Sequence, residues 1–241
     1  MQDALSIAVQ SLHNDMQRIE THTHNLTNAT ATGYRRQISL QSAAAFDQVF
    51  QAESQVQQGQ PGNRTLAIDQ SVGVMKPTGK ALDLAIAGEG YFAVQTAQGV
   101  AYTRRGDFQV DAEGRLVTAS GEAVLSEQGQ LRLPHGSYAV DKHGAISVDG
   151  RQAGQLQLVE IKREHALVAL GNGLYRLAEA GINPAAIKTE IRSGYLEAAN
   201  VSTAQEMVGL METMRHFEAN QKLVQGYDDA LSKAIQKLGE F

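Results

Sequence analysis

The chain has 241 residues, of which 42% are hydrophobic and 20% are charged, a balance typical of a globular protein that buries a core. Its formal net charge of −5 gives no electrostatic reason to expect binding to nucleic acid or to an anionic membrane. Because the sequence contains no cysteine, disulfides, cysteine-ligated zinc and thiol nucleophiles are all excluded.

Neither a signal peptide nor a membrane span is expected. The N-terminal residues MQDALSIAVQ lack the cationic region and the continuous apolar region that a cleaved secretory signal carries. No run of the sequence approaches the roughly 18 apolar residues that a membrane-spanning helix needs.

Residues 1–31 have a helical pattern. Their apolar residues recur at steps of three and four, with Thr23 filling one gap, so they lie on one side of a helix: Leu5, Ala8, Leu12, Met16, Ile19 and Leu26. We expect this helix to end near Gly33, because glycine readily adopts the left-handed conformation that closes a helix C-terminus.

His22 and His24 are interpreted as polar helix positions rather than as metal ligands. Residues two apart on a helix point about 200° away from each other, so these two side chains cannot hold one ion together. No further histidine has a helix-compatible spacing to them. We therefore expect no metal and no other cofactor.

Residues 37–64 form a glutamine-rich connector that ends in QGQPGNRT. Its early part could extend the first helix, and its later part is typical of flexible or extended chain. Residues 65–197 have a different pattern, with short runs of alternating residues such as YFAVQT and AISVDG between glycine-containing turns. Since no helical period separates these runs, the pattern predicts antiparallel rather than parallel β structure.

The stretch LDLAIAGEGYFAV places Gly88, Gly90 and Ala93 in the pattern G-x-G-x-x-A. A dinucleotide site of this type requires a helix to begin at the glycines, and here a strand-like run follows instead. We interpret Gly88 and Gly90 as a tight turn between two strands. No local signature of a nucleophilic serine or of converging carboxylates is present, and we do not expect an enzyme.

Residues 202–238 predict a second amphipathic helix, about 55 Å long at 1.5 Å per residue. Its positions are spaced three and four apart, with two polar interruptions: Met207, Leu210, Met214, Phe217, Gln221, Val224, Asp228, Leu231, Ile235 and Leu238. Either Ser202 or Thr203 can cap its start. A neighbouring stripe of small residues indicates more than one helical neighbour, so we favour association with other copies over a hairpin packed on the chain's own β domain.

These patterns together predict an α+β fold in which long N- and C-terminal helices form a coiled-coil-like domain beside a central antiparallel all-β domain. The expected boundaries are residues 1–36 for the N-terminal helix, 37–64 for the connector, 65–197 for the β domain and 198–241 for the C-terminal helix.

Three stretches carry a resemblance to a known family. They are IETHTHNLTNATATGYRR at 19–36, ALDLAIAGEGYFAVQTAQGVAYTRRGDFQVDAEGRLVTASGEAVL at 81–125 and SGYLEAANVSTAQEMVGLMETMRHFEANQKLVQGYDDAL at 193–231. In order and content they resemble the axial proteins of the bacterial flagellum, the family of rod and hook subunits. The length and the N-terminal signature are most similar to proximal rod proteins of F type, with distal rod proteins of G type next.

The resemblance implies a structural subunit that polymerises through its terminal helices into a hollow rod across the periplasm. It implies copies of the chain, other rod proteins and the flagellar type III export apparatus as partners, and export without a cleaved signal. A hook-type subunit and an export-system adaptor are the alternatives. The expected assembly interface combines the apolar helix positions with Asn25 and Asn28, which match asparagines of the signature: Leu5, Leu12, Met16, Ile19, Asn25, Leu26, Asn28, Met207, Leu210, Met214, Phe217, Val224, Leu231, Ile235 and Leu238.

Overall fold

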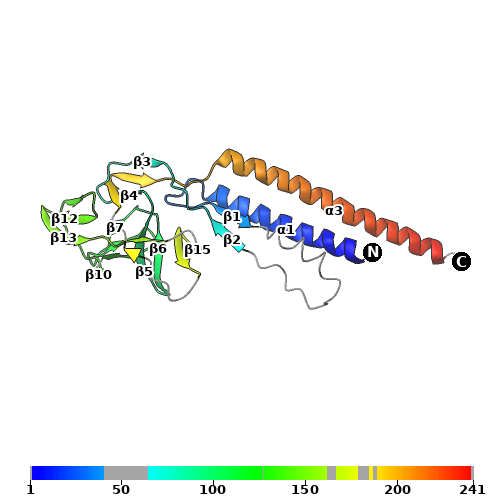
Figure 1. Ribbon diagram of the computed structural model, residues 1–241, viewed down its shortest axis with the longest axis horizontal. Helices are drawn as coiled ribbons and strands as arrows, with labels where there is room; N and C mark the ends of the chain where they lie inside the picture. The colour runs from blue at the N-terminus through cyan, green and yellow to red at the C-terminus, as the bar shows by residue number, and fades with distance from the viewer. Residues whose placement is uncertain are drawn as a thin grey trace. The chain divides into compact units, whose positions relative to one another are not determined.

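The computed structural model describes residues 2–40, 65–126, 128–161, 167–178, 185–186 and 189–239. Within these ranges the chain divides into two compact units. The helical unit contains residues 2–27 and 202–239, and the β unit contains residues 28–40 and 66–201. The fold is therefore α+β, with a helix at each end of the chain and antiparallel strands between them (Figure 1).

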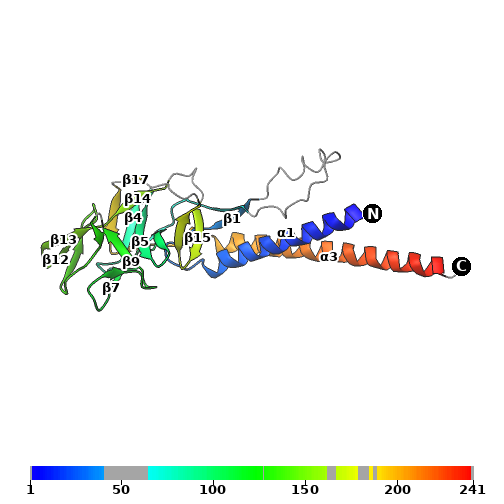
Figure 2. The same cartoon turned by 90° about the horizontal axis from the view of Figure 1, so that it is seen from below.

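The helical unit consists of α1 (Gln2–Thr27) and α3 (Thr203–Gly239), which run antiparallel and side by side (Figures 1 and 2). The backbone carbonyl of Ser202 accepts the first helical hydrogen bond of α3, from the N–H of Glu206 at 3.0 Å. Because α3 has 37 residues and α1 has 26, the last turns of α3 extend past the beginning of α1 (Figure 2). No helix in the described part of the chain is long and apolar enough to cross a membrane.

The first helix ends earlier than predicted, at Thr27 instead of near Gly33. Three threonines in its last turns turn their hydroxyls back to the carbonyl four residues earlier, at 2.7–2.8 Å: Thr21, Thr23 and Thr27. Such back-bonding and β-branching weaken a helix. Residues 28–36, which the sequence pattern assigns to the helical domain, accordingly belong to the β unit.

The main sheet of the β unit has ten strands. Its principal path is β15 (Leu167–Gly171), β16 (Leu174–Leu177), β6 (Gly99–Thr103), β5 (Tyr91–Thr96), β9 (Ala123–Ser126), β8 (Leu116–Val117) and β7 (Gln109–Val110). Three strands join beside this path: β10 (Gly129–Gln130) pairs with β9, β14 (Leu158–Glu160) with β5, and β17 (Ala185–Ala186) with β14.

Four smaller sheets accompany the main sheet in the described part of the chain. They are β1 (Gln37–Leu40) with β2 (Thr65–Ile68), β11 (Tyr138–Val140) with β12 (Ala145–Val148) and β13 (Arg151–Gln155), β4 (Leu84–Ala87) with β18 (Glu190–Ser193), and β3 (Met75–Pro77) with β19 (Tyr195–Glu197). Every strand pair with a described register is antiparallel, as predicted. The predicted connector reduces to β1 here, since residues 41–64 lie outside the described residues.

Strand β5 is buried on both faces and separates two hydrophobic clusters. Phe92 and Val94 point into the larger cluster, where Phe92 meets Phe108 edge to face at 5.1 Å between ring centroids. Tyr91 and Ala93 point into the smaller cluster, as the period of two in a strand requires. The core of this unit therefore lies on either side of β5.

Candidate functional site

The contact between α1 and α3 is only half apolar. Side chains that are buried or half-buried on α3 recur at steps of four and three, and they define the inner seam: Glu206, Leu210, Thr213, Phe217, Asn220, Val224 and Tyr227. Polar residues thus alternate with apolar ones along the seam. Of the heptad positions that the sequence predicted, Leu210, Phe217 and Val224 lie in this seam, whereas Met207 and Met214 are exposed and the polar residues one position earlier take their place.

A first polar cluster lies near the end of α1 and the beginning of α3. Nδ1 of His22 lies 2.6 Å from Oε2 of Glu206, and the side-chain amide of Asn25 donates to the same oxygen at 3.3 Å. Glu206 and Asn25 are each only 1% exposed. A carboxylate removed from water in this way depends on its partners, so the cluster ties the two helices together at this level.

A second polar cluster lies further along the pair. Nδ1 of His216 lies 2.6 Å from Oδ2 of Asp15, and the amide of Asn220 donates to that oxygen at 3.0 Å and to the hydroxyl of Ser11 at 2.9 Å. Asp15 is 2% exposed. Here α1 supplies the carboxylate, whereas in the first cluster α3 supplies it.

Large apolar side chains cover the outside of the same helices. Among the side chains of α1 and α3 that the structure describes, ten large apolar ones are between 38% and 63% exposed: Leu5, Ile7, Val9, Met16, Met207, Val208, Met211, Met214, Leu223 and Ile235. A soluble protein seldom exposes apolar residues in such density unless another surface covers them. Methionine, which supplies four of the ten, adapts well to varied apolar contacts.

The structure divides the predicted interface residues between the two sides of the helices. Five are exposed on the outside: Leu5, Met16, Met207, Met214 and Ile235. Seven are half-buried, namely Leu12, Ile19, Leu26, Asn28, Leu210, Phe217 and Val224, and Asn25 is buried. The side chains of Leu231 and Leu238 lie outside the described residues. The hydropathy pattern did not distinguish the inner seam from the outer sides of the helices. About half of the seam residues are polar, so they do not appear in a pattern of apolar residues.

The β unit contains a buried ionic cluster, here called the junction cluster, formed by Arg35, Arg104 and Glu197. Nη1 of Arg35 lies 2.9 Å from Oε1 of Glu197, and Nε of Arg104 lies 3.4 Å from Oε2 of the same carboxylate. The N–H of Gly73 donates to Oε1 at 2.8 Å. None of the three charged side chains is more than 2% exposed, so two guanidinium groups depend on one buried carboxylate.

Two tyrosines enclose the junction cluster. The guanidinium of Arg104 lies 5.6 Å from the centroid of the Tyr91 ring, and the hydroxyl of Tyr175 accepts a hydrogen bond from the N–H of Arg35 at 3.0 Å. Burial lowers the pKa of Arg104 to about 10, and the charge of Glu197 counteracts that effect. Burial also raises the pKa of both Tyr91 and Tyr175.

The backbone around the junction cluster is closely packed. Gly33 has a φ of 64° and donates its N–H to the carbonyl of Glu197 at 2.8 Å. A Cβ at Gly33 would lie well within 3.0 Å of the backbone of Arg104 and Arg105. Only glycine combines a positive φ with so close an approach of another backbone segment. These two requirements account for Gly33, which the sequence pattern had assigned to the end of the helix.

The turn between β4 and β5 is attached to the same cluster. Gly88 and Gly90 have φ angles of 139° and 129°, and Nη2 of Arg104 donates to the carbonyl of Gly88. A strand, β5, follows the glycines, as predicted, whereas a dinucleotide site would need a helix there. Among the described residues, no group of three or more histidine or acidic side chains is placed to hold a metal ion.

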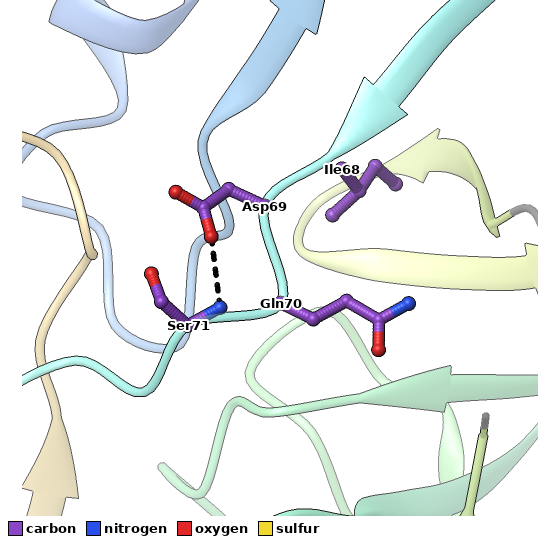
Figure 3. Close-up of a pocket in the computed structure, with 4 residues that line it drawn as sticks. All are labelled: Ile68, Asp69, Gln70 and Ser71. Atoms are coloured by element: carbon purple, nitrogen blue, oxygen red, sulfur yellow. Dashed lines mark hydrogen bonds between the residues drawn. The ribbon is translucent and has the colours of Figure 1, made fainter. Parts of the chain in front are cut away.

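A shallow hollow follows β2 and is lined by Ile68, Asp69, Gln70 and Ser71 (Figure 3). Oδ1 of Asp69 accepts a hydrogen bond from the N–H of Ser71 at 2.9 Å, which closes a local turn (Figure 3). The amide of Asn200 donates to the carbonyls of Asp69 and Ser71 at 3.0 Å. These bonds hold the loop to the segment that precedes α3. We therefore interpret the hollow as a part of the packing around the junction cluster.

The three sequence stretches quoted above converge on the junction cluster. Arg35 comes from the first, Arg104 from the second and Glu197 from the third. Sequence reasoning did not predict this contact. Its only signal was a charged residue inside each stretch, and nothing in one sequence shows that such residues meet.

Family models match two segments of the chain, and these overlap the second and third stretches. Residues 192–237 match the family model described as "Flagellar basal body rod FlgEFG protein C-terminal", and residues 85–150 match "Flagellar hook protein FlgE/F/G D1 domain". The first match contains most of α3, and the second contains β5 and most of the main sheet.

Relatives match over almost the whole chain. The chain is 30% identical over 256 residues to the flagellar basal-body rod protein FlgF of Escherichia coli, covering 99% of each protein. It is also 30% identical over 250 residues to FlgF of Rhizobium meliloti, again covering 99% of each. FlgG of Buchnera aphidicola subsp. Schizaphis graminum is 30% identical over 250 residues, covering 92% of this chain and 95% of the relative. The chain therefore belongs to the family of flagellar basal-body rod proteins of F or G type.

Proposed function

We propose that this protein is a structural subunit of the flagellar basal-body rod, which assembles with copies of itself and with other rod proteins. The names of its relatives support the rod, and the exposed apolar sides of α1 and α3 support assembly through the terminal helices. That exposure is the observation on which the proposal rests.

The energetics favour covering these sides. Full burial of a Met, Leu or Ile side chain is worth roughly 1.5–3 kcal/mol, so covering the remaining half of each contributes about 1 kcal/mol. A rod is a helical filament, and its contacts must be heterologous and must not close on themselves. Each helix pair would then meet other pairs on its outer sides and form a coiled-coil-like layer around a hollow axis.

The proposal extends to the location and type of the subunit. We place it in the basal body, as part of a drive-shaft across the periplasm that it reaches through the flagellar type III export apparatus without a cleaved signal. Relatives of F type cover 99% of the chain, and we propose a proximal rod protein of F type. A distal rod protein of G type is the alternative, supported by G-type relatives that cover 92% and 98% of the chain. No enzymatic activity and no nucleic-acid ligand form part of the proposal.

Electron microscopy of isolated basal bodies tests the proposal. Cells that carry a tagged copy of this chain as their only copy should show the tag on the rod, and cells without the chain should stop rod growth at one fixed length. A tag that stays in the cytoplasm, or complete rods in cells without the chain, would contradict a structural role.

A further inference from the structure

The two polar clusters between α1 and α3 are reciprocal. In the first, α3 supplies the carboxylate of Glu206, and α1 supplies His22 and Asn25. In the second, α1 supplies the carboxylate of Asp15, and α3 supplies a histidine and an asparagine in turn. Each buried carboxylate thus contacts a histidine and an asparagine of the opposite helix.

The steric fit around His22 adds a second, independent constraint. A Cβ placed on Gly209 of α3 would lie 2.6 Å from Cε1 of the His22 ring, so the ring packs where α3 has no side chain. The residues seven positions before and after Gly209 are Ser202 and His216, and both have a side chain. A shift of the helices by one heptad would therefore move the ring against a side chain.

The same shift would separate both carboxylates from their partners. Asp15 would move along α3 to face the levels of Gly209 or Leu223 instead of His216. A buried carboxylate without its partner is strongly unfavourable, and a polar residue within a helical interface is known to fix register for this reason. The apolar residues of the seam impose no comparable penalty, because a heptad shift exchanges one apolar contact for another.

We infer that the two polar clusters and Gly209 hold α1 and α3 in a single antiparallel register. The inner seam accepts α3 in this register only, and the apolar outer sides accept helices of other copies. The register is a property of the single chain, whereas the use of the outer sides by other copies rests on the proposed rod function.

Engineered cysteines can measure the register, because the chain has no cysteine of its own. Asn220 and Ser11 touch at 2.9 Å, so the full chain with Ser11→Cys and Asn220→Cys should form an intramolecular disulfide on mild oxidation. The pair Ser11→Cys and Thr213→Cys lies one heptad out of register, about 10 Å apart along the axis, and should not close. We expect the in-register disulfide to exceed the other by at least roughly 100-fold.

The decisive variant carries Asp15→Leu and Glu206→Leu in both cysteine backgrounds. Leucine removes the polar penalty and keeps the seam apolar, so we expect equal or higher thermal stability and a ratio of the two disulfides within about tenfold. The matched control, Glu212→Gln with Glu218→Gln, changes two exposed acids of α3 and should leave the parent ratio unchanged. If the leucine variant keeps the parent ratio, the polar clusters do not set the register and the inference is wrong.

A milder variant covers the case in which the leucine variant loses its helical circular dichroism. Asp15→Asn with Glu206→Gln retains size and removes charge, and it should lower the disulfide ratio at least about threefold. If this variant keeps the same ratio of the two disulfides as the parent chain, the inference is also wrong. All these measurements use dilute full-length chain without rods, so they give a result even if the proposed function fails.

Discussion

Arg35 and Glu197 form a 2.9 Å ion pair in which the two side chains are only 1% and 2% exposed. Arg35 follows α1 in the chain, and Glu197 closes β19 shortly before α3 begins. The pair therefore joins the two segments that lead into the terminal helices, and Arg104 joins both of them to the main sheet. Because all three groups are buried, loss of the Glu197 carboxylate should destabilise the β unit.

Glu197→Gln should destabilise the β unit by about 3–5 kcal/mol, because it removes the buried carboxylate that both guanidiniums contact. Asp107→Asn is the matched control, since its ion pair with Arg105 at 2.7 Å is about one quarter exposed and should cost no more than about 1 kcal/mol. Urea unfolding followed by tyrosine near-ultraviolet circular dichroism measures both. Equal losses in the two variants would show that the junction cluster carries no special weight.

Gly33→Ala should destabilise the β unit by about 3 kcal/mol, because a Cβ at that position would press into the backbone of Arg104. Gly79→Ala is the control that distinguishes the steric contact at Gly33 from the cost of a positive φ. Gly79 has a comparable φ of 76° with nothing within 4 Å of its Cβ position, so only the conformational cost of roughly 1–2 kcal/mol applies. Thermal unfolding of the two variants should differ clearly, and a common value would mean that the backbone approach is not required.

Alkaline pH should destabilise the β unit through its buried tyrosines. Burial raises the pKa of Tyr91, Tyr102 and Tyr175 above the ordinary 10.0, so their contribution to stability is complete below pH 10 and is lost as the pH rises beyond it. The lowered pKa of Arg104 has the opposite effect: between its folded pKa of about 10 and its ordinary 12.5, it makes the unfolding free energy rise with pH. It is a single group, whereas three tyrosines lower the unfolding free energy. Above pH 10 the unfolding free energy should therefore fall.

Phenolate absorbance recorded against pH tests this prediction. Part of the signal should appear only together with loss of β circular dichroism, and Tyr175→Phe should reduce that part. The prediction fails if the whole phenolate signal develops at the ordinary tyrosine pKa while the β unit stays folded.

Met214→Asp should block assembly and leave the single chain folded. Met214 is 47% exposed on the outside of α3, so a charge there should change monomer stability by no more than about 0.5 kcal/mol. In an assembled contact the same charge would lose its water, which should weaken association at least about tenfold. Met214→Leu keeps the surface apolar and should assemble normally. Sedimentation and motility of complemented cells measure the outcome, and normal rods with the aspartate would exclude this side of α3 from the contact.

The end of α3 should become protected only on assembly. Ser11 meets Asn220, so Gln2, nine residues before Ser11, faces α3 near Asp229, nine residues after Asn220. Residues 230–239 therefore extend past α1, and Ile235 is 61% exposed there. Amide hydrogen exchange should be fast in this segment of the dilute monomer and slow in rods. The paired part of both helices should exchange more slowly than residues 230–239 in the dilute monomer, because the inner seam holds it. Equal protection of residues 230–239 and of the paired part in dilute monomer would contradict this.

Local patterns in the sequence were sufficient for the secondary structure of both units. The alternation in YFAVQT predicted β5, and the spacing of apolar residues predicted both terminal helices. These features depend on neighbours in the chain, so one sequence contains them. The end of α1 was misplaced because Gly33 has the conformation expected of a helix end but serves a contact with the backbone of Arg104.

Contacts between distant segments could not be read in the same way. Met207 and Met214 satisfy a heptad, yet they are exposed, and Glu206 and Thr213, one residue earlier, are buried in the seam. A polar residue becomes favourable in a seam only when a distant partner such as His22 is in place. The junction cluster was missed for the same reason, because burying Arg35 is acceptable only once the fold brings Glu197 to it.

The pairing of β18 with β4 and of β19 with β3 sets the time at which the β unit can close. A ribosome must translate beyond residue 197 before strands β18 and β19 and the Glu197 carboxylate that Arg35 and Arg104 contact exist. Until then the nascent polypeptide holds two guanidiniums without their carboxylate and two strands without their neighbours. For a subunit that passes through an export apparatus, as proposed, this order of synthesis delays the closed state of the β unit until β19 has been made.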